Sequence, residues 1–225
     1  RSKKNQYYRI LSEFMLQQTQ VKTVIPYFVK FISKIPSLKV LSKNSEKKVL
    51  KLWEGLGYYR RAKNLHKTAK ILVKNYNGKL PVEFNEIKNL PGIGEYTARA
   101  LLALVYNKPY IPFDGNVTRV FSRLFSLNSL NSEKKIKKII DKKFYTNRNR
   151  DLAEALMEFG AIICKPINPE CAICNLKKNC QFFRNKIFHS ASKKRFIKEK
   201  KYNIYCYLKK QKKEIALTNN KKLSF

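Results

Sequence analysis

The feature that most restricts the fold of this chain is a group of four cysteines in its C-terminal third. Cys164, Cys171, Cys174 and Cys180 are spaced C-x6-C-x2-C-x5-C. Four thiolates at such spacing can close a short loop around a [4Fe-4S] cluster or a tetrahedral zinc ion, and the spacing does not choose between them. The tight clustering argues against a secreted disulfide scaffold. The sequence therefore predicts a metal-bearing loop, with Cys206 outside it as a buried strand residue.

Most of the remaining chain is predicted to be helical. Apolar residues recur at helical spacing within residues 21–32, 65–76, 117–124 and 152–163, and glycine and proline residues separate these segments. Ser45 before Glu46 is typical of a helix start. With 225 residues, 44% of them apolar, the chain is long enough to fill one or two cores. After the cysteines, residues 202–208 alternate at period two, which predicts a strand that pairs with residues 215–217 across the turn at 211–213.

The charge balance is strongly basic. Lys and Arg number 49 against 15 Asp and Glu, for a formal net charge of +34. Such a field favours a polyanionic partner, although an AT-rich genome also raises the lysine content of a protein. The sequence has no apolar stretch long enough for a membrane span and no signal-like segment near its start, so we expect a soluble, intracellular protein that makes no membrane contact.

Two glycines, Gly92 and Gly94, lie just before a predicted helix in the segment LPGIGEYTA, residues 90–98. Backbone N–H groups at the start of a helix can approach a phosphate closely where no Cβ intervenes. This segment predicts a phosphate-binding turn, and the alternative is an ordinary glycine-containing turn.

Several motifs occur together in one order along the chain. They are LSEFMLQQTQ at 11–20, WEGLGYY at 53–59, the LPGIGEYTA segment, DGNV at 114–117 and the four cysteines. As a set they resemble the adenine DNA glycosylase (MutY) family. Endonuclease III is a relative that shares the turn, the aspartate and the cysteines, but the QQT and GYY motifs resemble the adenine enzyme.

The resemblance implies a mainly α, two-lobed helix-hairpin-helix DNA glycosylase fold with a [4Fe-4S] cluster loop, followed by the start of a truncated C-terminal β-containing domain. Residues 20–118 would form a helical barrel domain with the helix-hairpin-helix. Residues 1–19 and 119–185 would form the iron-sulfur cluster domain. Residues 186–201 would be a linker, and residues 202–225 the beginning of a NUDIX-like recognition domain.

The implied activity is a monofunctional DNA glycosylase that excises adenine mispaired with 8-oxoguanine or guanine in base excision repair. Cleaving this N-glycosidic bond needs a proton for the base and a negative charge near the sugar, and two carboxylates in different environments meet both needs. By resemblance, Glu13 is the general acid toward adenine N7 and Asp114 stabilises the sugar carbon or bonds to it transiently. The alternatives are a solvated helix residue for Glu13 and a helix N-cap for Asp114.

Further site residues also follow from the resemblance. Gln17, Gln18, Thr19 and Tyr58 match positions at the duplex and the partner guanine, since the target base must leave the stack while another group fills the gap. Asn116 matches a site-shaping residue and Glu158 an adenine-pocket carboxylate, while packing roles remain the alternative for Gln18 and Tyr58. Tyr96 stands where bifunctional relatives carry a Schiff-base lysine, so we expect base hydrolysis that leaves the strand intact.

Other interpretations of the same residues remain open. The chain can be a thymine-mismatch or oxidised-pyrimidine glycosylase on the same scaffold, or an inactive cluster-bearing DNA-binding module. The main interpretation implies a monomer that binds double-stranded DNA with adenine opposite 8-oxoguanine or guanine, in a bacterial-type cytoplasm and nucleoid. His66 and His189 match no catalytic position, and we expect both to be surface or structural residues.

Overall fold

The computed structural model describes residues 5–127, 132–143, 147–185, 205–209 and 214–218. For residues 132–133, 141–143 and the last two ranges only the backbone is described. Interresidue contacts divide the chain into residues 1–188 and residues 189–225, and each unit is considered by itself.

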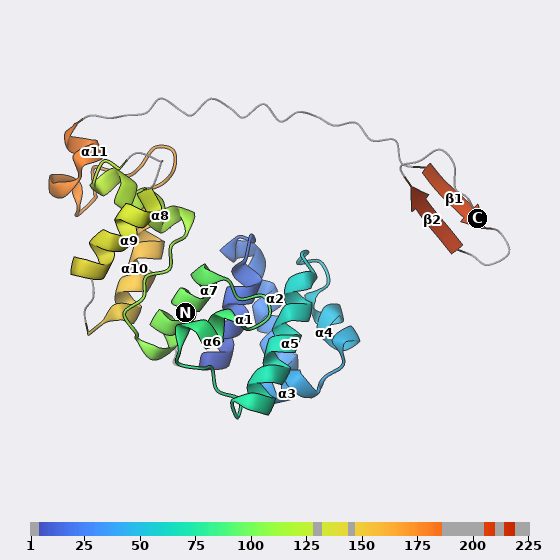
Figure 1. The fold of residues 1–225 in the computed structure, drawn as a ribbon. Helices are drawn as coiled ribbons and strands as arrows, with labels where there is room; N and C mark the ends of the chain where they lie inside the picture. The colour runs from blue at the N-terminus through green and yellow to red at the C-terminus, as the bar shows by residue number, and fades with distance from the viewer. Residues whose placement is uncertain (1–4, 128–131, 144–146, 186–204, 210–213, 219–225) are drawn as a thin grey trace. The chain divides into compact units, whose positions relative to one another are not determined.

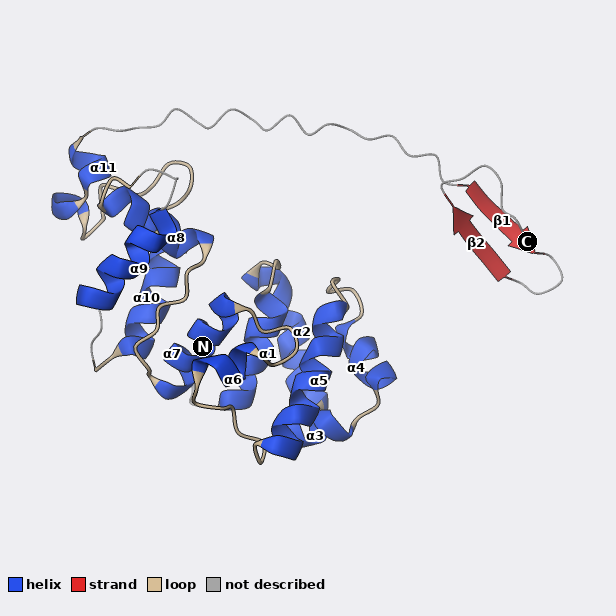
Figure 2. Cartoon of the chain, in the orientation of Figure 1, coloured by secondary structure: helices blue, strands red, loops and turns tan. Residues whose placement is uncertain are grey.

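The first unit is helical, which confirms the predicted class. Its elements are α1 (Gln6–Leu16), α2 (Val21–Lys34), α3 (Leu38–Lys43), α4 (Glu46–Trp53), α5 (Arg60–Asn75), α6 (Phe84–Lys88), α7 (Glu95–Tyr106), α8 (Gly115–Leu124), α9 (Ser132–Lys143), α10 (Asn149–Ile162), the 3₁₀ turn η1 (Lys177–Asn179) and α11 (Gln181–Arg184) (Figures 1 and 2). Polar side chains accept hydrogen bonds from the first backbone N–H groups of several helices, as expected for N-caps. Ser45 caps α4 through Lys48 N, which confirms the predicted helix start.

A first hydrophobic core lies among α1 to α7. Trp53 and Phe31 are fully buried in it and meet edge to face, with ring centroids 6.1 Å apart. From α1, Ile10, Leu11 and Phe14 are also fully buried there. Burial of this apolar surface is the main force that holds short helices together, because helices of this length are marginal alone.

A second core lies among α7 to α10. Its buried residues include Leu104 of α7, Phe121 of α8, Ile136 of α9 and Met157 of α10. Helix α7 contributes to both cores: Leu101 and Leu102 face the first, whereas Ala100, Ala103 and Leu104 face the second. Helix α7, whose position is shown in Figure 1, is thus an apolar helix shared by the two cores.

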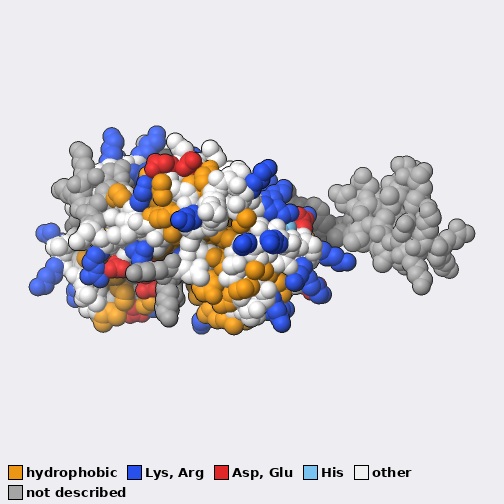
Figure 3. Space-filling model, turned by 90° about the horizontal axis from the view of Figure 1, so that it is seen from below, with side chains coloured by type: hydrophobic (Ala, Val, Ile, Leu, Met, Phe, Trp, Pro, Cys, Tyr) orange, Lys and Arg blue, Asp and Glu red, His pale blue; other side chains and the backbone are white. Residues whose placement is uncertain are grey.

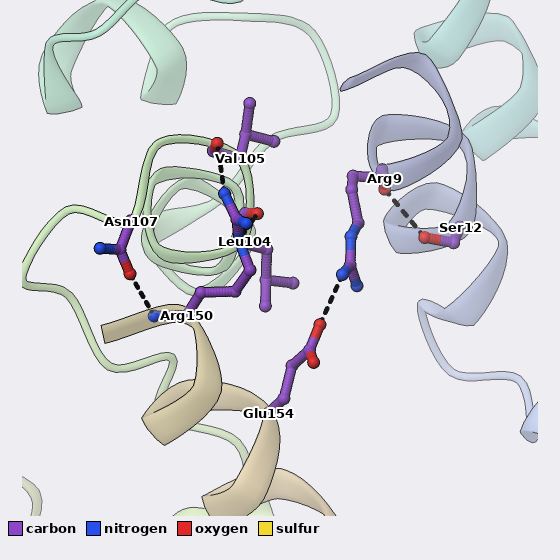
Figure 4. Close-up of polar contacts among 7 residues, drawn as sticks. All are labelled: Arg9, Ser12, Leu104, Val105, Asn107, Arg150 and Glu154. Carbon is purple, nitrogen blue, oxygen red and sulfur yellow. Dashed lines mark hydrogen bonds and ion pairs between the residues drawn. The ribbon is translucent and has the colours of Figure 1, made fainter. Parts of the chain in front are cut away.

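Polar contacts also tie these helices together (Figure 4). Arg9 of α1 forms an ion pair of 2.5 Å with Glu154 of α10. At the C-terminal end of α7, Arg150 Nε donates to the Leu104 carbonyl at 2.7 Å, and Asn107 Oδ1 accepts from the Arg150 backbone N–H at 2.8 Å. Carbonyl groups at a helix C-terminus have no partner within the helix, so the first bond satisfies part of the end of α7, and the second satisfies a backbone N–H in the first turn of α10.

The second unit contains a β-hairpin. Strands β1 (Tyr205–Lys209) and β2 (Glu214–Thr218) pair antiparallel, with Tyr205 opposite Thr218 and Lys209 opposite Glu214. The predicted pairing is confirmed for residues 206–208 with 215–217, whereas residues 202–204 and the predicted turn at 211–213 lie outside the described residues. The predicted linker and His189 lie outside the described residues, and the burial of Cys206 concerns a side chain that the structure does not describe.

Basic side chains are spread over the surface. Figure 3 shows lysine and arginine over much of the face in view and few acidic side chains between them. None of the helices in the described ranges is both long and apolar enough to cross a lipid bilayer. The division of the first unit into a barrel domain and a cluster domain stays a prediction.

Candidate functional site

The turn between α6 and α7 has the features of an anion-binding helix start. Gly92 has φ +79°, and a Cβ there would lie 2.7 Å from Asn64 Cβ and 2.9 Å from Phe14 Cε1, so only glycine fits. Thr68 Oγ1 donates to the Pro91 carbonyl at 2.9 Å and anchors the turn. Gly94 is the N-cap of α7 and is exposed, which leaves the first N–H groups of this helix accessible to a ligand.

The QQT motif follows α1 and lies beside this turn. Gln17 is half-buried, and its Nε2 donates to the Gly92 carbonyl at 3.1 Å and to Thr97 Oγ1 at 3.5 Å. Gln18 is exposed and adopts a left-handed backbone, with φ +56°. Thr19 is half-buried, and its hydroxyl donates to the Gln17 carbonyl at 3.5 Å. Gln17 therefore joins the end of α1 to the α6–α7 turn and leaves Gln18 facing solvent.

Tyr58 is presented to solvent by the GLGYY loop. It is 60% exposed and, like Gln18, has a positive φ of 49°. Non-glycine residues rarely adopt this conformation, which marks the loop as one held in place by its surroundings. An exposed ring of this size does not fit the alternative of a core packing residue.

Glu13 is a buried carboxylate on α1. Only 8% of the residue is exposed, and its neighbours in sequence Phe14 and Met15 are fully buried. The alternative of a solvated helix residue is therefore wrong.

Tyr96 in the first turn of α7 is half-buried, and its hydroxyl lies 3.5 Å from Met157 Sδ.

Asp114 is the N-cap of α8, as the structural alternative predicted. Its Oδ1 accepts from Val117 N at 2.7 Å, and its Oδ2 accepts from Asn116 Nδ2 at 3.1 Å. The two bonds fix the plane of the carboxylate, which remains half-buried. Capping and a catalytic role are compatible, because capping occupies one oxygen and orients the other. The structure thus brings together Asp114 and Asn116, both predicted site residues.

Arg119 extends this contact toward the cysteines. Its Nη2 donates to Asn116 Oδ1 at 2.8 Å and to the Gly160 carbonyl at 2.7 Å, and its Nε donates to the Cys164 carbonyl at 2.8 Å. Gly160 allows the close approach, because a Cβ there would lie 2.7 Å from Asn116 Cβ and 3.0 Å from the Asn116 carbonyl. Sequence reasoning missed Arg119, since its partners lie up to 45 residues away.

Glu158, the predicted adenine-pocket carboxylate, lies on α10 and is exposed.

The four cysteines line one pocket whose other walls are mainly apolar, including Val120, Phe159, Ile163 and Phe182. All four are half-buried free thiols. Burial, and secondly the negative charge of the other three thiolates, raises the pKa of the Cys171 thiol. Across the described ranges, no three Cys, His or carboxylate side chains converge at a point suited to a single metal ion.

Arg123 on α8 supports the cysteine loop. Its Nη1 donates to the Lys165 carbonyl at 2.6 Å and to Cys164 Sγ at 3.5 Å, and Cys180 Sγ donates to the Arg123 carbonyl at 3.6 Å. The guanidinium also lies 5.0 Å from the Phe182 ring centroid. Cys164 thus has a positively charged donor of the kind that stabilises a thiolate ligand.

Comparison with known proteins places these features in a family. The sequence pattern of the HhH-GPD superfamily base excision DNA repair proteins matches residues 11–145. The chain is 45% identical over 206 residues to an adenine DNA glycosylase of Buchnera aphidicola subsp. Baizongia pistaciae, with 89% of this chain and 59% of the relative covered. It is 46% identical over 174 residues to that of Buchnera aphidicola subsp. Acyrthosiphon pisum, covering 76% of this chain and 50% of the relative.

The fold is similar to that of a thermostable thymine-DNA glycosylase, with a TM-score of 0.73, 27% identity and coverage of 81% of this chain and 86% of that one. The chain spans between a half and two thirds of the length of the two Buchnera relatives. These relatives confirm the resemblance to adenine DNA glycosylases on which the site residues were predicted. The chain therefore belongs to the HhH-GPD superfamily of base excision DNA repair proteins.

Proposed function

We propose that the chain is the excising part of a monofunctional adenine DNA glycosylase that acts on adenine opposite 8-oxoguanine or guanine in double-stranded DNA. The observation that carries the proposal is the pair of carboxylates in unlike environments within family motifs: Glu13 is buried, and Asp114 is half-buried with both oxygens engaged in orienting bonds. The two Buchnera relatives are adenine DNA glycosylases, which supports adenine as the base.

The two carboxylates have different tasks in this proposal. Glu13, shielded from water, holds the proton that passes to adenine N7, and the bond between the base and the sugar then breaks with its electrons on the base. Asp114 stabilises the positive charge that develops at the sugar carbon. Water adds to this carbon and its proton returns to the Glu13 carboxylate, which leaves free adenine, an abasic sugar and a protonated Glu13. Asn116 orients Asp114 through its 3.1 Å bond.

The product follows from the residue in the first turn of α7. Tyr96 is a phenol at the place of the amine that bifunctional relatives use, so the chain has no nucleophilic amine there to form a Schiff base with the sugar. The strand should remain intact after base removal and break only on alkaline treatment.

DNA binding has three components in this proposal. The N–H groups at the start of α7, with Gly92 and Gly94, hold a backbone phosphate. Gln18 and Tyr58, both exposed, enter the duplex at the mismatch, with Gln17 and Thr19 supporting the loop and Glu158 contacting the extruded base. The net charge of +34 supplies the general attraction for DNA. We propose that the chain binds DNA as a monomer.

We also propose that Cys164, Cys171, Cys174 and Cys180 hold a [4Fe-4S] cluster, since all four line one pocket next to Arg123. The group would hold the loop closed and play no part in the hydrolysis. Iron and sulfide at about four equivalents each after anaerobic purification are expected. One equivalent of zinc without iron would assign the pocket to zinc instead, and Cys174→Ser should lose the bound metal in either case.

A single assay tests the activity against its alternatives. Duplexes that carry 8-oxoguanine:A, G:A, G:T or thymine glycol are incubated with the protein, and strand breaks are compared with and without alkali. Alkali-dependent breaks at adenine in the first two duplexes are expected. Breaks at thymine would favour the mismatch alternative, for which the fold similarity to a thymine-DNA glycosylase is the reason to include it. Breaks in none of the duplexes would favour an inactive DNA-binding module.

A further inference from the structure

Arg61, near the start of α5, has an unusual set of partners. It is 7% exposed, and its guanidinium donates to carbonyl groups at the C-terminal end of α1 and in the GLGYY loop. The acceptors are the carbonyls of Phe14 at 3.3 Å, Met15 at 2.7 Å, Gln17 at 2.5 Å, Leu56 at 3.4 Å and Gly57 at 3.2 Å. Nη1 donates to the end of α1 and Nη2 donates to the GLGYY loop, so one planar group joins two segments that are far apart in sequence.

Two of these carbonyls have a special position. Gln17 O belongs to the peptide group before Gln18, which has φ +56°, and Gly57 O belongs to the peptide group before Tyr58, which has φ +49°. The orientation of a peptide plane is set by the torsions on either side of it. A hydrogen bond to that carbonyl therefore resists relaxation of the following residue out of its left-handed conformation.

The rings around Arg61 reinforce this arrangement. Its guanidinium carbon lies 5.2 Å from the Tyr58 ring centroid and 5.6 Å from that of Trp53. Trp53 Nε1 donates to the Gly57 carbonyl at 3.1 Å, so this oxygen has two donors. Cation–π attraction to Arg61 restrains the Tyr58 ring directly, and the hydrogen bond to the Gly57 carbonyl restrains the backbone next to it.

We infer that Arg61 is a positioning residue that holds the exposed Gln18 and Tyr58 side chains in fixed places relative to each other for entry into the duplex. The inference rests on the proposed function for the role of those two side chains. The guanidinium suits the task because its fork has five donors in one plane and can reach both loops at once. The ammonium group of a lysine at the same position has its three donors on one nitrogen atom, so it cannot bond to the end of α1 and to the GLGYY loop at once.

The test is Arg61→Lys, with Arg60→Lys as the matched control, since Arg60 is the exposed neighbour on the same helix. Single-turnover excision from an 8-oxoguanine:A duplex should fall by about tenfold or more in Arg61→Lys and stay unchanged in the control. In the Tyr58→Ala background, where the positioned ring is absent, the same change should cost no more than about threefold. An equal loss in both backgrounds would mean that Arg61 acts through general stability, and no loss in either would overturn the inference.

A second readout does not depend on excision. In the Glu13→Gln background, a fluorescent 2-aminopurine placed next to the mismatched adenine should brighten on binding, because entry of the side chains unstacks it. Arg61→Lys should reduce this brightening while DNA remains saturated with protein. Full brightening would overturn the positioning role, whatever the outcome of the excision assay. Absence of excision by the unmodified chain, with normal brightening, would instead count against the proposed function alone.

Trp53→Phe covers the case in which Arg61→Lys does not fold, as judged by circular dichroism. It keeps an aromatic ring in the core, removes the donor to the Gly57 carbonyl and also removes part of the buried ring area of Trp53, so circular dichroism is recorded for this variant too. A smaller loss in the same direction, about two- to threefold in both excision and brightening, is expected. Unchanged values in this variant, together with an unfolded Arg61→Lys, would leave Arg61 a purely structural residue and overturn the inference.

Discussion

At the scale of single residues, Glu13 differs from every other proposed site carboxylate by its burial. We predict that Glu13→Gln lowers single-turnover excision by at least about 10³-fold, because an amide keeps the shape but has no proton to transfer. DNA affinity should stay within a small factor of that of the unmodified chain. The control is Glu46→Gln, at an exposed glutamate of α4. Substantial residual excision would remove Glu13 from the role of general acid.

Asp114 combines a structural and a chemical role, and the two can be separated. In Asp114→Asn the side-chain oxygen can still accept from Val117 N, so the melting temperature should change little while excision falls by about 10²–10³-fold. Asp114→Ala removes the cap as well, and should cost about 1 kcal/mol of the free energy of unfolding. Thermal melts alongside single-turnover rates measure both effects. An active Asp114→Asn would reduce the residue to a helix cap.

His66 is a buried histidine of α5, 1% exposed, which agrees with the expected structural role. Burial, and secondly the charge of Lys70, lowers its pKa below the ordinary value of 6.5. The unfolded chain therefore takes up the proton more readily than the folded chain, and stability is lost as the pH falls below about 6.5. We predict that His66→Gln flattens the decline in melting temperature between about pH 7 and pH 5. An equally steep decline in the variant would show that other groups cause it.

At the scale of elements, the packing of α8 on α10 determines where Asn116 lies. Gly160→Ala would place a Cβ 2.7 Å from Asn116 Cβ and 3.0 Å from its backbone carbonyl, so the helices must separate. We predict a loss of about 1–3 kcal/mol in the free energy of unfolding, with a fall in excision. The bonds of Arg119 to Gly160 and Asn116 would be disturbed at the same contact.

The control for this prediction is Ala161→Ser, at an exposed position of the same helix. Denaturant unfolding and single-turnover excision are measured for both variants. If Gly160→Ala matched the control in both measurements, the close contact between α8 and α10 would have no bearing on the arrangement of Asn116.

At the scale of the whole molecule, the relevant quantity is the net charge of +34. Neutralised phosphates release condensed counterions, so affinity for DNA should fall with salt by at least about 10³-fold between 50 and 200 mM. Fluorescence anisotropy with an undamaged duplex measures the slope of log affinity against log salt. A nearly flat slope would mean that most of the basic residues lie away from the DNA.

The sequence alone predicted those features that depend on neighbours along the chain. Helical periodicity predicted the mainly α class, Ser45 predicted the start of α4, and alternation predicted the pairing of β1 with β2. Motif order predicted the family, because spacing along the chain is itself part of a motif. The cap and the periodic faces are local signals, set within one or two helical turns, whereas the order of the motifs is recorded along the whole sequence.

The burial of individual side chains and their bonds to distant groups follow from the tertiary structure and not from the sequence pattern. Glutamate is a residue type usually found at the surface, yet packing against the first core shields Glu13 from water. Arg61 and Arg119 look like two of many basic residues, but each donates to a carbonyl group more than 40 residues away in sequence. The packing of whole helices determines these partners. A pattern within a single segment does not predict them, because hydrogen bonding and burial depend on which groups are close in space.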